Sequence, residues 1–91
     1  MSCKWDEAKR QDNIENHGID FVDAVEVFDG DILVVEDDRF AYGERRFIAL
    51  GLMKGIVIAV VYTERGDNVR IISARKATRY EEKKYFEKIF D

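Results

Sequence analysis

Residues 46–74 read RFIALGLMKGIVIAVVYTERGDNVRIISA, and this stretch decides the fold. Glycine-containing turns at 54–55 and 65–67 divide it into three runs typical of strands joined by tight hairpins. The middle run, 56–63, is apolar on both faces, so we expect it to be a central strand. A further strand-like run, 32–37, precedes this stretch. Consecutive hairpins predict a four-stranded antiparallel meander. The predicted strands are 32–37, 46–53, 56–63 and 69–74.

The predicted helices are 6–17, 20–28 and a last one from 78 to the C-terminus. Asp6 and Asp20 are residue types that cap helix N-termini, because their side chains accept hydrogen bonds from free backbone N–H groups. Thr78 followed by Glu81 fits a capping box. Two helices before a meander and one after it predict an α+β fold.

Length and composition predict one domain over 1–91. The chain is 46% hydrophobic and 37% charged, a balance typical of a folded globular protein. Its longest apolar run, 56–62, is far shorter than the roughly 20 residues of a membrane span, and no secretory signal opens the chain. One cysteine, Cys3, and one histidine, His17, leave no internal disulfide and no Cys- or His-rich metal site. We therefore expect a soluble, cytoplasmic protein without a cofactor or membrane partner.

Charge is unevenly distributed along the chain. The net charge of −4 argues mildly against nucleic-acid binding. Residues 1–63, however, hold 13 Asp and Glu against 7 Lys and Arg, whereas residues 65–84 hold 7 Lys and Arg against 3 Asp and Glu. An acidic body with a basic C-terminal third is able to bind an anion locally and a basic partner elsewhere.

The arginines of the last strand are the best candidates for chemistry. Arg70 and Arg75 are five residues apart, which places them on opposite faces unless a bulge or the strand end re-aims Arg75. Arg75, Lys76 and Arg79 surround the start of the last helix, where the positive end of the helix dipole favours an anion. Guanidinium groups bind phosphate bidentately and stabilise developing negative charge without a metal.

Other polar and aromatic residues leave alternatives open. Glu64 is able to move a proton. His17 fits either a general base or a favourable charge in the last turn of a helix, and its spacing favours the structural role. Trp5 fits a base-stacking side chain, although an aromatic residue is more often part of a core. The carboxylates at 36–38 alternate between strand faces and converge poorly on a metal ion.

Several segments together resemble the BrnT toxin family, in the same order and spacing over nearly the whole chain. Two blocks are the most specific: the one ending in His17-Gly18-Ile19, and the Arg-Ile-Ile-Ser-Ala-Arg block at 70–75. Asn16 stands where the family commonly has lysine, which removes one positive charge. The matching segments are 5–9, 13–21, 24–29, 46–51, 60–65 and 70–77.

The resemblance implies a RelE-like fold and a metal-independent endoribonuclease of a type II toxin–antitoxin pair. It implies RNA as substrate and a BrnA-like antitoxin as partner in a hetero-oligomer that binds its own promoter DNA through the antitoxin. An arginine near the end of the last strand contacts the scissile phosphate in RelE-like nucleases, and Arg75 occupies that position. The expected catalytic residues are Arg75, Glu64, His17 and Arg70. The expected RNA-binding residues are Lys9, Arg46, Arg65, Lys76, Arg79 and Trp5.

Two further hypotheses compete with the nuclease. A non-catalytic domain that holds RNA or an acidic protein on the same basic residues fits the net acidity and the lack of an obvious general base. An inert partner subunit fits the polar first helix, 6–17, whose apolar face is thin and suits an interface.

Overall fold

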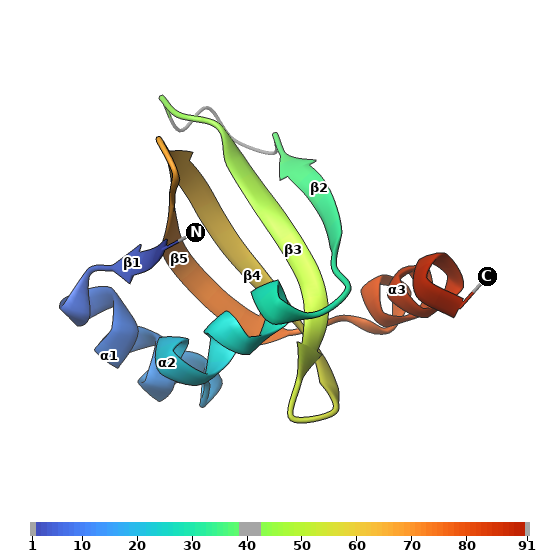
Figure 1. Cartoon of the computed structure of the whole chain (residues 1–91). Helices are drawn as coiled ribbons and strands as arrows, with labels where there is room; N and C mark the ends of the chain where they lie inside the picture. The colour runs from blue at the N-terminus through green and yellow to red at the C-terminus, as the bar shows by residue number, and fades with distance from the viewer. Residues whose placement is uncertain (1, 39–42, 91) are drawn as a thin grey trace.

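A five-stranded sheet organises the chain, in the order β1-β5-β4-β3-β2 (Figure 1). The computed structural model describes residues 2–38 and 43–90. The strands are β1 (Ser2–Trp5), β2 (Leu33–Asp37), β3 (Arg46–Met53), β4 (Ile56–Arg65) and β5 (Asn68–Lys76). The helices are α1 (Glu7–His17), α2 (Phe21–Ala24), the short 3₁₀ helix η1 (Val25–Asp29) and α3 (Arg79–Phe90).

The predicted meander is confirmed for four strands, and the prediction of a purely antiparallel four-stranded sheet is wrong. The chain from β2 to β5 folds back on itself in consecutive antiparallel pairs, as the hairpin signals indicated. The fifth strand, β1, adds to the edge of β5 in parallel, with Cys3 beside Val69. A parallel pair requires a long crossover connection, and a four-residue strand carries too little alternation to reveal it in sequence.

The predicted helix starts are confirmed, because each rests on a local hydrogen bond. Asp6 accepts from the backbone N–H groups of Ala8 and Lys9, and Asp20 accepts from that of Val22. The second predicted helix is regular only as far as Ala24 and then tightens into η1. Among the described residues, no helix is both long and apolar enough to cross a membrane.

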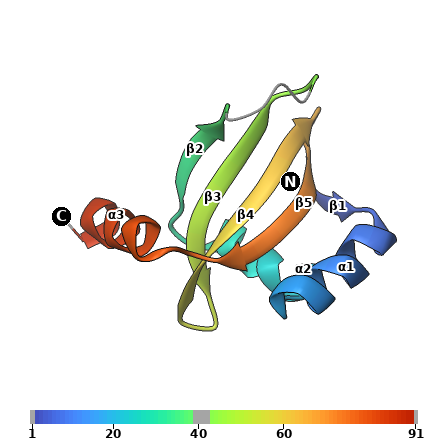
Figure 2. The same cartoon turned by 180° about the vertical axis from the view of Figure 1, so that it is seen from behind.

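The sheet separates two hydrophobic cores. The helices α1, α2 and η1 pack on one face, where Phe21, Val60 and Ile71 are buried. On the other face, Tyr85 of α3 packs against strand residues such as Leu50 and donates a hydrogen bond to the Asp31 carbonyl. Figure 2 shows this second face: α3 lies to one side, and no helix lies in front of the upper part of β3, β4 and β5. We call this uncovered part the open face.

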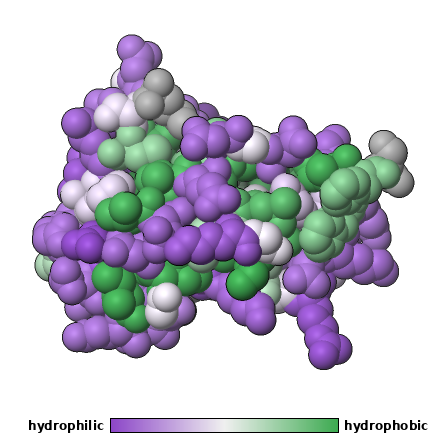
Figure 3. All heavy atoms as spheres, turned by 60° about the horizontal axis from the view of Figure 1, so that its bottom comes forward, coloured by the Kyte–Doolittle hydropathy of each residue, from purple (hydrophilic) through white to green (hydrophobic). Residues whose placement is uncertain are grey.

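The far end of α3 remains apolar at its surface. Phe86 and Phe90 stack with ring centroids 5.7 Å apart, and Phe90 is 74% exposed. Green surface beside the grey C-terminal residue, on the right in Figure 3, marks this end of the helix. The helix is therefore held to the sheet by one stripe of residues, chiefly through Tyr85.

Candidate functional site

A bulge in β5 decides which way the arginines of the last strand face. Val61 pairs with Ser73 and the next residue, Tyr62, pairs with Ile71, so Ile72 is the extra residue. The bulge resets the alternation of side chains along the strand. Arg70 and Arg75 therefore both point to the face opposite the α1–α2 layer, which is the alternative that the sequence left open.

The open face carries a row of polar side chains across the sheet. Lys4 of β1 pairs with Arg70 of β5, which in turn pairs with Thr63 of β4. Tyr62 of β4 pairs with Phe47 of β3, so the next residue of β4, Thr63, lies opposite Arg46. Arg46 in turn pairs with Asp37 of β2. Directly paired side chains lie about 5 Å apart at Cβ, so three cations share one continuous line.

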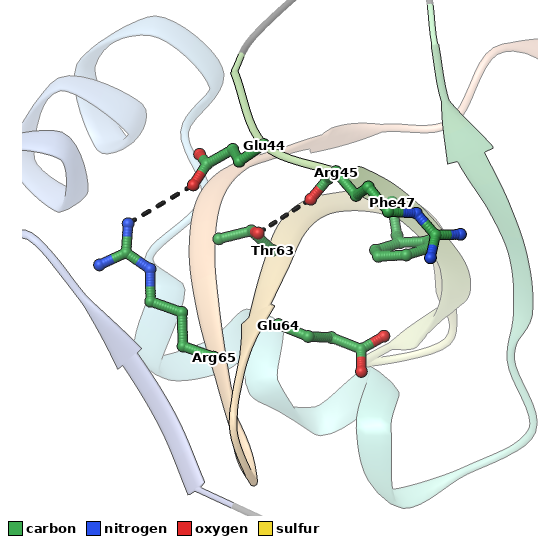
Figure 4. Close-up of a pocket in the computed structure, with 6 residues that line it drawn as sticks. All are labelled: Glu44, Arg45, Phe47, Thr63, Glu64 and Arg65. Atoms are coloured by element: carbon green, nitrogen blue, oxygen red, sulfur yellow. Dashed lines mark hydrogen bonds and ion pairs between the residues drawn. The ribbon is translucent and has the colours of Figure 1, made fainter.

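A carboxylate that the sequence reasoning missed lies at the end of this row. Glu44 lies 3.6 Å from the Nε of Arg46 and 3.5 Å from a terminal nitrogen of Arg65. A cavity of about 380 Å³ opens here at the ends of β3 and β4. Figure 4 shows Glu44 and Arg65 linked across it, and the Thr63 hydroxyl donating to the backbone carbonyl of Arg45 at 2.8 Å. Glu44 precedes Arg46 by two residues, so that contact is local, and the pairing of β3 with β4 brings Arg65 to it.

Arg75 is already engaged by a carboxylate. Its guanidinium donates two hydrogen bonds to Glu81, at 2.7 and 3.0 Å. The predicted capping box is confirmed, because Glu81 accepts from the Thr78 backbone and the Thr78 hydroxyl accepts from the Glu81 backbone. Arg75 lowers the pKa of Glu81, and the Thr78 N–H adds to this effect. The predicted anion site at the start of α3 thus holds the chain's own carboxylate.

Glu64 points away from the open face. It alternates with Arg65 along β4, and Figure 4 shows the two side chains leaving the strand in opposite directions. Its neighbour on the helix side is Tyr62, which stacks on Phe47 with ring centroids 5.6 Å apart. Burial raises the pKa of Tyr62, and the nearby Glu64 carboxylate adds to the rise. Glu64 nevertheless lines the same cavity as Glu44 and Arg65, whereas Arg70 is not among the residues that line it.

The remaining predicted site residues are dispersed. Lys9 and His17 are exposed on α1, on the opposite side of the sheet from Arg70. Trp5 is half-buried in the core beneath α2, where its ring meets that of Phe21 edge to face at 6.1 Å. Lys76 and Arg79, at the end of β5 and the start of α3, are exposed.

Metal-ligating side chains are not grouped in the described chain. Across residues 2–38 and 43–90, no three His, Cys, Asp or Glu side chains lie close enough together to hold a metal ion. The side chains that do converge are Arg46, Arg65 and Glu44, with Arg70 further along the same face. Chemically, this set is able to hold a phosphodiester and to accept a proton beside it.

Comparisons with known proteins agree with this fold. A family model described as the ribonuclease toxin BrnT of type II toxin–antitoxin systems matches residues 5–81. One similar solved structure is that of the Brucella abortus ribonuclease toxin BrnT. It is 36% identical, has a TM-score of 0.70, and the match covers 87% of this chain and 99% of that one. A search of curated proteins gives no match. Because the family match spans most of the sequence, the chain belongs to the BrnT family of ribonuclease toxins of type II toxin–antitoxin systems.

Proposed function

We propose that this chain is a metal-independent endoribonuclease that binds RNA across the open face. The observation that carries the proposal is the row of cations from Lys4 through Arg70 to Arg46, continued by Arg65 at the strand end. Phosphates repeat along an RNA strand, so a line of cations suits one backbone. Arginine suits this role because its planar guanidinium forms two parallel hydrogen bonds with a phosphate.

The proposed chemistry uses one carboxylate and two guanidinium groups of this chain, with water as the proton donor. Glu44 accepts the proton of a ribose 2′-hydroxyl, and the 2′-oxygen attacks the adjacent phosphorus. The bond from phosphorus to the 5′-oxygen breaks, and that oxygen takes a proton from water. The hydroxide that remains takes the proton held on Glu44, which restores the carboxylate. One product strand ends in a 2′,3′-cyclic phosphate and the other in a 5′-hydroxyl. Arg46 and Arg65, which contact Glu44, stabilise the negative charge that develops on the phosphate oxygens.

Arg75 receives a positioning role in this proposal. Its two hydrogen bonds to Glu81 fix the start of α3 against the end of β5. A direct contact between Arg75 and the scissile phosphate stays a prediction, because it requires the guanidinium to exchange a carboxylate for RNA. Glu64 and His17 likewise stay predicted catalytic residues. Glu64 lines the same cavity as Glu44, and the contacts of Glu44 with Arg46 and Arg65 favour Glu44 as the proton acceptor.

The proposed partners follow from the family. A type II system pairs the toxin with a protein antitoxin, and we propose a BrnA-like antitoxin in a hetero-oligomer that binds promoter DNA through the antitoxin. We place the chain in the cytoplasm, where its RNA substrate is found. The acidic first half of the chain supports contact with a basic segment of that partner.

The test is RNA cleavage by the purified chain, freed of antitoxin, in buffer containing EDTA. The wild type is expected to cut structured RNA, and Glu44→Gln and Arg70→Ala are each expected to cut at least about 100-fold more slowly. Lys54→Ala is the matched control, because Lys54 lies at the far hairpin, 3.7 Å from Asp23. Cleavage that appears only after Mg²⁺ is added contradicts metal independence.

A non-catalytic RNA-binding domain is the second candidate. The observation that favours it is that the acidic Glu44 is already neutralised by two arginines. It predicts RNA binding that weakens with salt and leaves no cleavage products.

A further inference from the structure

An apolar groove separates α3 from the sheet. It has a volume of about 330 Å³ and is lined by Leu33 and Val35 of β2, Leu50 of β3, and Tyr80, Glu81 and Lys84 of α3. A second cavity of about 330 Å³ shares Leu33 and Lys84 with it and continues along α3. Tyr80 is 69% exposed and Val35 is 47% exposed, so the groove is open to solvent along its length.

The edge strand beside the groove has a free side. Within the described residues, β2 pairs with β3 alone and ends the sheet. Its outer backbone N–H and C=O groups therefore present a template for another strand. Val34 and Val35 are exposed on it, at 40% and 47%, and the charged residues of this strand, Glu36 and Asp37, stand at its C-terminal end. An extended segment that adds here places alternate side chains into the groove.

The charges around the groove select the kind of segment. Lys84 lies over the Tyr80 ring, with its Nζ 5.5 Å from the ring centroid, and Lys88 lines the second cavity. Two carboxylates of this helix also line the cavities, and each faces a cation of its own: Glu81 accepts two hydrogen bonds from Arg75, and Glu87 lies 3.9 Å from Lys83. Lys84 and Lys88 are the cations of the α3 wall that these two pairs do not use, and they suit an apolar segment flanked by carboxylates.

The groove leads directly onto the open face. Val35 and Asp37 lie on the same face of β2, and Asp37 pairs with Arg46 in the polar row. A strand that pairs along the outer edge of β2 therefore ends beside Asp37, with β2 between it and Arg46.

We propose that this groove receives an extended acidic segment of the antitoxin, paired along β2 and anchored by an apolar side chain between Val35 and Tyr80. The inference rests on the proposed antitoxin partnership.

The test uses calorimetry to measure the affinity of the chain for a BrnA-like antitoxin. Val35→Glu is expected to raise the Kd at least tenfold, because a carboxylate replaces the apolar anchor contact. The double variant Lys84→Glu, Lys88→Glu is expected to raise the Kd at least tenfold at low salt, with a smaller effect at high salt. Val22→Glu, at a 53% exposed valine on α2, is the matched control and is expected to bind as the wild type does.

Hydrogen exchange supplies a second readout. Antitoxin binding is expected to slow the exchange of backbone amides in 33–37 and 80–88, and circular dichroism melts verify that each variant is folded. Unchanged exchange there, or Kd values of the groove variants within twofold of the wild type, overturns the proposal. The proposal is also overturned if sedimentation shows that the groove variants only dissociate a dimer of this chain. Binding is measured without RNA, so a failure of the nuclease proposal leaves this test intact.

Discussion

The side-chain amide of Asn13 closes a ring of two hydrogen bonds with the backbone of Ala74. Its Nδ2 donates to the Ala74 carbonyl at 2.9 Å, and its Oδ1 accepts from the Ala74 N–H at 3.0 Å. The same Nδ2 donates to the Ile19 carbonyl at 2.8 Å. Because β1 pairs with β5 only as far as Ile71, Asn13 takes the place of a strand residue beside the bulge that turns Arg75.

Asn13→Ala is expected to lower the free energy of unfolding by about 3 kcal/mol. It leaves buried backbone groups on Ile19 and Ala74 without their partner, and each such group costs roughly 1–3 kcal/mol. Urea denaturation followed by circular dichroism measures the change. Asn16→Ala is the control, because Asn16 is exposed on the same helix. A loss no larger than that of the control contradicts this role for Asn13.

The sequence predicts those parts of the fold that depend on neighbouring residues. Both hairpins and the caps at Asp6, Asp20 and Thr78 are confirmed, since each is a contact within a few residues. The parallel pairing of β1 is a contact between the two ends of the chain, and its four residues carry no pattern of their own. In the sequence, Asn13 is one of many polar residues in a polar helix, and its contact with β5 cannot be predicted from it.

Gly51→Ala is expected to destabilise the chain by about 2 kcal/mol, the usual cost of overpacking a core. A Cβ at Gly51 would lie 2.8 Å from the Cβ of Val27 and 3.2 Å from the Cγ2 of Ile32, because η1 crosses β3 there. Thermal denaturation measures the effect. Gly30→Ala is the control, since its added Cβ meets nothing within 4 Å. Equal melting temperatures for the two variants argue against close packing at Gly51.

The contact between Arg75 and Glu81 is expected to stabilise the fold by about 2 kcal/mol, as charged hydrogen bonds in partly buried positions do. A double-mutant cycle with Arg75→Ala and Glu81→Ala measures the coupling between them in unfolding experiments. Arg75→Lys is the informative companion, because it keeps the charge but loses the bidentate contact. If Arg75→Ala abolishes RNA cleavage with no loss of stability, Arg75 touches the phosphate and the positioning role is wrong.

The candidate site is predictable from sequence only in part. The basic character of the last strand is visible in composition, and Arg70 and Arg46 lie on the open face. Whether Arg70 and Arg75 share a face depends on the bulge at Ile72, which no local signal reveals. Glu44 meets its neighbour Arg46 locally but meets Arg65 only through strand pairing, so residue type alone cannot distinguish it from Glu64.

Acid is expected to destabilise the chain through Asp20 at an unusually low pH. The Arg10 guanidinium, with help from the Val22 N–H, lowers the pKa of Asp20 to about 2, from 3.8. A depressed pKa in the folded state stabilises the fold above pH 3.8, and this contribution is lost as the pH falls toward 2. Asp20→Asn keeps a capping side chain but removes the charge. Unfolding of this variant is expected to depend less on pH in that window, and an unchanged dependence contradicts the assignment.

Arg70 and Lys9 lie on opposite sides of the sheet, and RNA binding distinguishes between those sides. The logarithm of the affinity for single-stranded RNA falls with the logarithm of salt concentration by about 0.7 for each phosphate neutralised. In a Glu44→Gln background, which prevents cleavage, Arg70→Ala is expected to reduce that slope by about 0.7. Lys9→Ala is expected to leave the slope unchanged, because its ammonium group lies on α1, behind the sheet. The reverse outcome, a smaller slope for Lys9→Ala alone, places RNA on the helical side and removes the open face from the mechanism.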